Sequence, residues 1–251
     1  MSRWFMTRSR KQQHSEDVQY HLFGDPHRRA SSLSDIILGG QDGLVNVLGV
    51  ILGVAAATQD PRIVLVAGLA ATFAESVSMG AVAYTSTLAD ADFYDSERAR
   101  EFRHITEVPH LEKSEVREIY VRKGFAGQLL DRIVETITAN EDVWVAVMMN
   151  EEHQLSPKNR RQALETALVV GISAIIGSLI PLVPFILLPV VHAMWVAVLT
   201  TGLTLFGVGA YKARTTVGRP AKSGLEMAMI GTASALVGYA VGALMKIPPS
   251  P

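Results

Sequence analysis

The stretch that decides the fold runs from Thr166 to Tyr211 and reads TALVVGISAIIGSLIPLVPFILLPVVHAMWVAVLTTGLTLFGVGAY. None of its 46 residues is Asp, Glu, Lys or Arg. A helix needs about 20 mostly apolar residues to cross the hydrocarbon core of a bilayer, so this stretch can form two such helices. Of all 251 residues only 19% are charged, against about 25% in soluble domains. The sequence excludes a soluble enzyme and a disordered chain, and the absence of cysteine excludes a disulfide scaffold.

Hydropathy predicts an all-α polytopic membrane protein with five transmembrane helices. These cover residues 35–58, 63–88, 162–180, 185–211 and 224–245. Three prolines place the predicted turn between the third and fourth helices at residues 181–189, because proline disfavours a helix interior. The chain then divides into a tail at 1–34, two helices within 35–88, a polar helical insert at 89–161, three helices within 162–246 and a C-terminal tail at 247–251.

Lys and Arg are distributed unevenly between the two sides of the membrane. Segments 1–34, 89–161 and 212–222 hold 21 of the 23 basic residues, whereas the turns at 59–62 and 181–189 hold one and none. Because loops rich in Lys and Arg stay in the cytoplasm, we expect the N-terminus and the insert there. The tail lacks the apolar core of a signal peptide, which favours a bacterial plasma membrane, with a vacuolar membrane as the alternative.

Two carboxylates lie inside predicted membrane helices, where charged side chains are costly and usually functional. Asp42 is followed one turn later by Asn46, and Glu75 is followed one turn later by Met79. Carboxylate together with thioether suits a borderline-soft divalent ion such as Fe²⁺, so these four residues form a predicted transport pathway. The alternatives are that Asp42 caps a broken helix and that Glu75 is a structural hydrogen-bond anchor. Glu226 is expected at the membrane surface, near the start of its helix.

The insert is predicted to form short helices at residues 96–105, 113–123, 125–139 and 141–153, the first of them continuing the second membrane helix. Several of these helices carry side chains that bind metals. Carboxylates bind hard and borderline ions, imidazole favours transition metals and thioether adds softness. The candidate ligands are Glu97, Glu101, His104, Glu112, Glu115, Glu118, Met148, Met149, Glu151 and Glu152. The alternative is that the acidic residues and His104 belong to solvated helix faces and that the two methionines belong to an ordinary apolar core.

Pairs of glycines four residues apart, Gly49 with Gly53 and Gly238 with Gly242, allow membrane helices to approach closely. We expect these pairs to serve packing within the membrane, with a self-associating face as the alternative.

The chain resembles the vacuolar iron transporter family over about residues 33–246. The resemblance rests on the order and spacing of several short motifs. They are DGLV at 42–45, SMG at 78–80, EIYVRKG at 118–124, and W-x-x-x-M at 144–148 followed by EE at 151–152. Five membrane helices with a helical insert after the second also match the plan of that family.

The resemblance implies proton-coupled export of Fe²⁺ from the cytosol by a homodimer with a pore between its subunits. It further implies a transporter rather than an enzyme, with membrane lipid, a divalent metal ion and protons as partners. Mn²⁺ or Zn²⁺ are alternative ions, and the net charge of −1 argues against a nucleic-acid partner. Pore positions of the family match Asp42 and Met79, and its metal-binding positions match Glu101, Glu112, Glu115, Met148, Met149 and Glu152. His104 departs from the family pattern, which has a further Glu there.

A different class of function remains open at this point. The spacings Glu101-x-x-His104 and Glu107-x-x-His110 are those of di-iron carboxylate proteins, which would make the insert a membrane-tethered ferroxidase or a metal sensor. Pro109 interrupts the second motif, however, and short helices are poorly suited to a four-helix bundle. We therefore favour transport.

Overall fold

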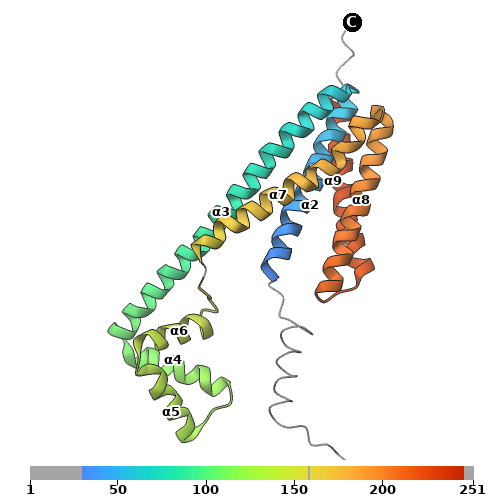
Figure 1. Ribbon diagram of the computed structural model, residues 1–251. Coiled ribbons are helices and arrows are strands. Elements are labelled where there is room, and N and C mark those ends of the chain that lie inside the picture. Colours follow the sequence, from blue (N-terminus) through green and yellow to red (C-terminus); the bar gives the residue numbers. More distant parts are fainter. Residues whose placement is uncertain (1–29, 158, 246–251) are drawn as a thin grey trace, which may run out of the picture.

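The computed structural model describes residues 30–157 and 159–245, and its regular structure there is entirely helical. Five long helices are α2 (Ala30–Thr58), α3 (Pro61–Glu107), α7 (Arg160–Leu187), α8 (Val190–Thr215) and α9 (Pro220–Leu244) (Figure 1). Each of the five is long and apolar enough to cross a membrane, which confirms the predicted all-α class with five spans. Residues 1–29 of the predicted tail and residues 246–251 lie outside the described part of the chain.

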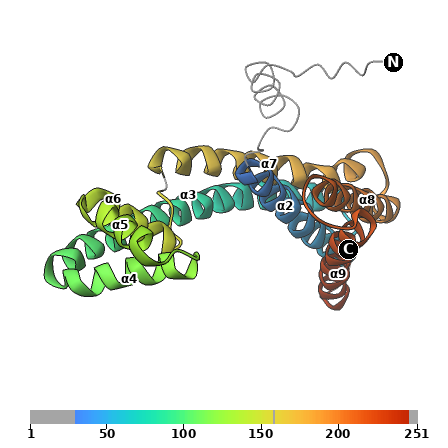
Figure 2. The same ribbon diagram turned by 90° about the horizontal axis from the view of Figure 1, so that it is seen from below.

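Three shorter helices follow α3 in the chain: α4 (Pro109–Arg122), α5 (Gly127–Thr138) and α6 (Glu141–Glu151). Figures 1 and 2 show them at the far end of α3, displaced from the bundle of long helices. They pack on one apolar cluster, formed mainly by the buried residues Val116, Ile119, Leu130, Val134, Trp144, Val145, Met148 and Met149, together with Ile105 of α3. We call these three helices the α4–α6 unit.

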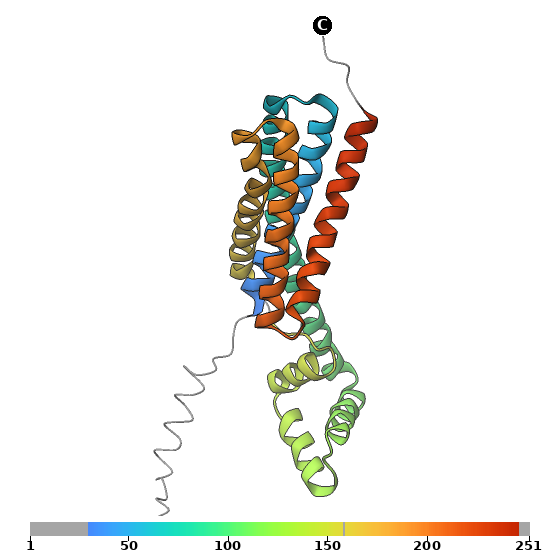
Figure 3. The ribbon, with the colours of Figure 1, turned by 90° about the vertical axis from the view of Figure 1, so that its right-hand side faces the viewer.

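Helix α3 is unusual in its length of 47 residues, which corresponds to about 70 Å at 1.5 Å per residue. Its first turn is fixed by Asp60, whose Oδ1 accepts hydrogen bonds from the backbone N–H groups of Arg62 (2.8 Å) and Ile63 (3.4 Å). The apolar half of α3 packs beside α7 and α2, and the polar half leaves the bundle and reaches the α4–α6 unit (Figure 3). The expected continuation of the second membrane helix through residues 96–105 is confirmed.

The predicted turn at residues 181–189 is wrong. Helix α7 continues through Pro181 and Pro184 to Leu187, and the chain turns only at residues 188–189. Each proline removes one backbone hydrogen bond, a loss that membrane helices tolerate where neighbouring helices cover the backbone. Both prolines are buried, and the extra turns carry Leu182 and Phe185 into the main apolar core. Burial of these side chains therefore outweighs the local preference of proline.

Helix ends in the insert differ from the expectation by a few residues. Helix α4 begins at Pro109 instead of residue 113, because proline suits the first helical turn, where its missing N–H is not needed. Helix α5 begins at Gly127. The capping role expected of Asn140 is confirmed, since its side chain accepts a hydrogen bond of 3.1 Å from the backbone N–H of Val143.

Helix α2 packs against its neighbours through glycine. A Cβ built on Gly238 would lie 2.1 Å from the carbonyl oxygen of Gly49, and one on Gly242 would lie 1.9 Å from that of Gly53. The two glycine pairs of the sequence therefore face each other within one chain, as expected of packing in the membrane. Gly177 of α7 meets Gly40 of α2 in the same way, at 2.2 Å.

We predict that Gly242→Ala destabilises the bundle, because the added methyl group would clash with the backbone of Gly53. Overpacking of this kind costs roughly 1–3 kcal/mol. The measurement is the thermal unfolding midpoint of the detergent-solubilised protein. Gly207→Ala in α8 is the matched control, since its Cβ would meet nothing within 4 Å. Equal midpoints for the two variants would contradict the prediction.

Candidate functional site

A polar cluster lies where α2 and α3 meet within the membrane-spanning part. The Asn46 side-chain amide donates a hydrogen bond of 3.0 Å to Oε1 of Glu75, and the carboxyl group of Asp42, one turn earlier on α2, interacts with the same Glu75. Met79 lies half-buried one turn beyond Glu75 on α3. The structure thus brings three of the four predicted pathway residues together. Helix α2 is unbroken at Asp42, so the alternative of a cap on a broken helix is wrong.

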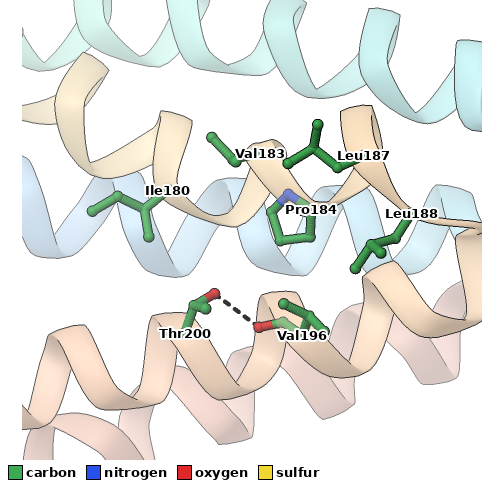
Figure 4. Close-up of a pocket in the computed structure, with 7 residues that line it drawn as sticks. All are labelled: Ile180, Val183, Pro184, Leu187, Leu188, Val196 and Thr200. Carbon is green, nitrogen blue, oxygen red and sulfur yellow. Dashed lines mark hydrogen bonds between the residues drawn. The ribbon is translucent and has the colours of Figure 1, made fainter.

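This cluster is accessible from one side of the chain. Asn46 is exposed and lines a groove that runs along α2 and α9. The other residues that line this groove include Gly49, Val50, Gly53 and Ser234. The opposite side of the bundle differs. There, Figure 4 shows a groove between α7 and α8 with apolar lining, in which the Thr200 hydroxyl donates to the Val196 carbonyl (2.8 Å). Neither groove is lined by a charged side chain, but the groove along α2 includes Asn46, which contacts Glu75, so the α2 side is the better candidate for an ion path.

A second cluster lies between the end of α3 and the α4–α6 unit. Glu101 of α3 and Glu112 of α4 are each only 3% exposed. His104 Nδ1 lies 3.3 Å from Oε1 of Glu112 and 3.9 Å from Oε1 of Glu101. One ligand atom from each of these three residues fits within 4.8 Å of the others, which is the spacing that a single metal ion requires. We call this group the acidic cluster.

Negative charge is concentrated at the acidic cluster. Burial raises the pKa of the Glu112 carboxyl to about 7, and repulsion from Glu101, Glu115 and Glu152 acts in the same direction. Burial also raises the pKa of Glu152, with Glu115 as the next cause. Carboxylates that repel one another in a buried place favour a bound cation, because the cation offsets both their repulsion and their desolvation.

The remaining candidate ligands fall into four groups. Glu115 and Glu152 border the acidic cluster, as their influence on Glu112 shows, while Glu97 forms an ion pair with Arg100 at 3.1 Å. Glu118 and Glu151 lie apart from it. Met148 and Met149 are fully buried in the apolar cluster of the α4–α6 unit, where they provide core packing.

Helix geometry explains why Glu118 lies apart. Successive residues rotate by about 100° around a helix axis, so Glu118 is turned about 120° away from Glu112 and is exposed. Glu151 instead forms an ion pair with Lys123 at the end of α4, which neutralises its charge.

One neighbour of the acidic cluster was not among the predicted ligands. His153 follows α6, and its Nε2 lies 2.9 Å from Oε1 of Glu101. Burial lowers the pKa of His153, but the hydrogen bond and the charge of Glu101 outweigh this effect, so the pKa is raised. The only signal in the sequence was a histidine directly after the acidic pair 151–152, and its approach to Glu101 depends on how α6 folds back onto α3.

We predict that acidification weakens metal binding at the acidic cluster. With a pKa of about 7, Glu112 is protonated below neutral pH and must lose that proton when a metal binds. One displaced proton weakens the apparent affinity about tenfold between pH 8 and pH 6. Anaerobic equilibrium dialysis of Fe²⁺ against the detergent-solubilised protein measures this.

Glu112→Gln is expected to bind Fe²⁺ less tightly at pH 8 and to show a weaker pH dependence. Glu135→Gln, an exposed substitution on α5, is the matched control and should behave like the unchanged protein. An affinity that is equal at the two pH values would contradict the prediction.

The sequence profile of the VIT family matches residues 33–243. Vacuolar iron transporter 1 of Arabidopsis thaliana is 32% identical over 215 residues, covering 84% of this chain and 85% of that protein. Vacuolar iron transporter 1 of Eucalyptus grandis is 32% identical over 86% and 89%, and the vacuolar iron transporter of Plasmodium berghei is 28% identical over 92% and 91% of the two chains. The chain belongs to the VIT family.

Proposed function

We propose that this protein exports Fe²⁺ from the cytosol in exchange for protons. The observation that carries the proposal is the contact of Asp42, Asn46 and Glu75 inside helices long enough to cross a membrane. Its relatives are named vacuolar iron transporters, which supports iron as the transported ion. Mn²⁺ and Zn²⁺ are the alternative transported ions.

We call the polar cluster of Asp42, Asn46 and Glu75 the membrane cluster. Its chemistry suits the exchange of a metal ion for protons. Two carboxylates and an amide supply oxygen ligands, and the Met79 thioether lies one turn away, a combination that suits borderline divalent ions. A carboxylate inside a membrane is stabilised by either a bound cation or a proton. Entry of a proton from the acidic side would therefore release the metal, which couples the two fluxes without covalent chemistry.

The acidic cluster is proposed to collect the metal before transport. The segment that carries it, 89–161, holds 11 of the 23 basic residues, which the positive-inside rule places in the cytosol. In this orientation, Fe²⁺ binds first to Glu101, His104 and Glu112 and then passes to the membrane cluster. The direction of transport is out of the cytosol.

A homodimer would complete the path. Asn46 is exposed at the surface of α2 within the membrane-spanning part, and lipid is a poor environment for an amide. A second copy of the chain against this face of α2 would cover Asn46 and enclose the ion path between the subunits.

Cysteine cross-linking tests this arrangement cleanly, because the sequence contains no cysteine. Val50 lies one turn beyond Asn46 on the same face of α2 and is 38% exposed. Val50→Cys is expected to give a disulfide-linked species of twice the 27.2 kDa chain mass when oxidised in membranes. Leu199→Cys, on the exposed side of α8, is the control that should remain monomeric on a denaturing gel. Cross-linking of the control alone would contradict the dimer.

We predict that Asp42→Asn abolishes Fe²⁺ uptake by proteoliposomes with an acidic lumen, lowering the rate at least tenfold. The substitution keeps the size of the side chain and removes the charge that binds the ion. The matched control is Glu226→Gln, since Glu226 is an exposed carboxylate of α9 paired with Lys222 at 3.8 Å. Fe²⁺ uptake that persists in Asp42→Asn, or an uptake rate that does not depend on the proton gradient, would contradict the proposal.

The same assay separates transport from oxidation when it is made anaerobic, because a ferroxidase needs O₂ and a transporter does not. Glu112→Gln is expected to raise the Fe²⁺ concentration for half-maximal uptake and to leave the maximal rate unchanged. A loss of maximal rate without a change in half-saturation would contradict the collecting role.

A further inference from the structure

We propose that the connection between α8 and α9 binds the headgroups of anionic phospholipids at the cytoplasmic surface of the membrane. We call residues 212–222 the basic loop. It contains Lys212, Arg214, Arg219 and Lys222, which the ion path described above does not use. The inference rests on the orientation of the chain given under the proposed function, and it requires neither metal binding nor transport.

Positive charge in the basic loop is dense and largely unpaired. The segment reads KARTTVGRPAK, with four basic and no acidic residues among its 11, and all four basic residues are exposed. Among residues 30–157 and 159–245, only Lys222 of the four forms an ion pair, with Glu226 at 3.8 Å. The charge of the other three is therefore not balanced by a described carboxylate of the chain.

The length of α8 places the basic loop at the level of the lipid headgroups. Tyr211 lies 21 residues beyond Val190, the first residue of α8, which corresponds to about 32 Å along the helix axis. The hydrocarbon core of a bilayer is about 30 Å thick. Tyr211 is exposed, and tyrosine is typical of the boundary between hydrocarbon and headgroups. Lys212, the next residue, therefore begins the headgroup region.

The two helix ends in the basic loop differ in how they tolerate positive charge. Lys212 and Arg214 lie in the last turn of α8, where the helix dipole favours cations. Arg219 and Lys222 lie at the start of α9, whose first turn contains no acidic residue and receives no side-chain cap. Cations are unfavourable at a helix N-terminus. An anion from outside the chain would therefore stabilise this end of α9, a feature that the orientation of the helices alone does not explain.

An apolar side chain lies among these charges. Val217 is fully exposed, between the end of α8 at Thr215 and the start of α9 at Pro220. Basic residues beside apolar ones are typical of segments that bind a membrane surface, where cations contact phosphate and apolar groups enter the acyl boundary. Figures 1 and 2 show the connection between α8 and α9 apart from the α4–α6 unit, so that unit leaves it open to lipid.

The test places a fluorescent reporter in the basic loop of the full-length protein, which contains no cysteine of its own. Val217→Cys is labelled with a nitrobenzoxadiazole fluorophore and reconstituted into vesicles of phosphatidylglycerol and phosphatidylcholine in equal amounts. A spin label that quenches the fluorophore is carried either by the phosphatidylglycerol or by the phosphatidylcholine. Quenching by the labelled phosphatidylglycerol is expected to be at least about threefold stronger.

Removal of two charges tests whether the basic residues cause this preference. Arg214→Gln combined with Arg219→Gln is expected to abolish it, because each basic residue near the surface adds about fivefold to the binding of anionic lipid. Two basic residues remain in the loop, so the orientation of the chain is kept. The matched control is Lys113→Gln combined with Arg132→Gln, which removes two exposed charges from the α4–α6 unit and should leave the preference unchanged.

Equal quenching by the two lipids, or a preference that survives the double substitution in the basic loop, would overturn the inference. Loss of the preference when chloride is replaced by inorganic phosphate at equal ionic strength would also overturn it, since the site would then bind free phosphate rather than lipid. The assay contains no metal ion, so its failure is distinguished from a failure of Fe²⁺ transport.

Discussion

The backbone of helix α2 lies in close contact with the backbones of two neighbouring helices, α7 and α9. The membrane part of the structure depends on this packing. Glycines on one side meet Gly177 of α7, and those on another side meet Gly238 and Gly242 of α9. Lipid supplies little hydrophobic force between helices, so close contact of small residues provides much of their association. Gly49 and Gly53 lie on the same side of α2 as Asp42 and Asn46, because residues four, seven and eleven positions apart share one helix face, and Asn46 on this side contacts Glu75.

Helix α3 joins the two polar clusters in one continuous element. Glu75 belongs to the membrane cluster and Glu101 to the acidic cluster, and no break in the helix separates them. They lie 26 residues apart in the sequence, which corresponds to about 39 Å along the helix axis. Under the proposed function, a metal ion collected at the acidic cluster would have to cover this distance to reach the membrane cluster.

Both clusters place carboxylates where water is scarce. In the acidic cluster, the burial of Glu101 and Glu112 is offset by neither Lys nor Arg among their described ion pairs, and the pKa of Glu112 is raised to about 7. An arrangement that served stability alone would pair such groups or expose them. The two places nevertheless differ in chemistry, since the membrane cluster combines carboxylates and an amide with the nearby Met79, whereas the acidic cluster contains the imidazole of His104 and lies beside His153.

Local patterns in the sequence determine the five membrane helices, the unbroken passage into residues 96–105 and the cap at Asn140, because hydropathy, helix periodicity and capping act over a few neighbouring residues. The position of the turn after α7 is different. Proline favours an earlier end, but the helix continues because Leu182 and Phe185 gain burial against helices distant in sequence.

The acidic cluster likewise depends partly on local sequence and partly on tertiary packing. Acids and one histidine at helical spacing were visible in the sequence, yet Glu118 turns away from Glu112 and Glu151 pairs with Lys123. His153 reaches Glu101 across 52 residues of chain, since α6 folds back onto the end of α3. Which side chains meet at the acidic cluster is settled by how α3, α4 and the segment after α6 pack together, because these residues are distant in the sequence.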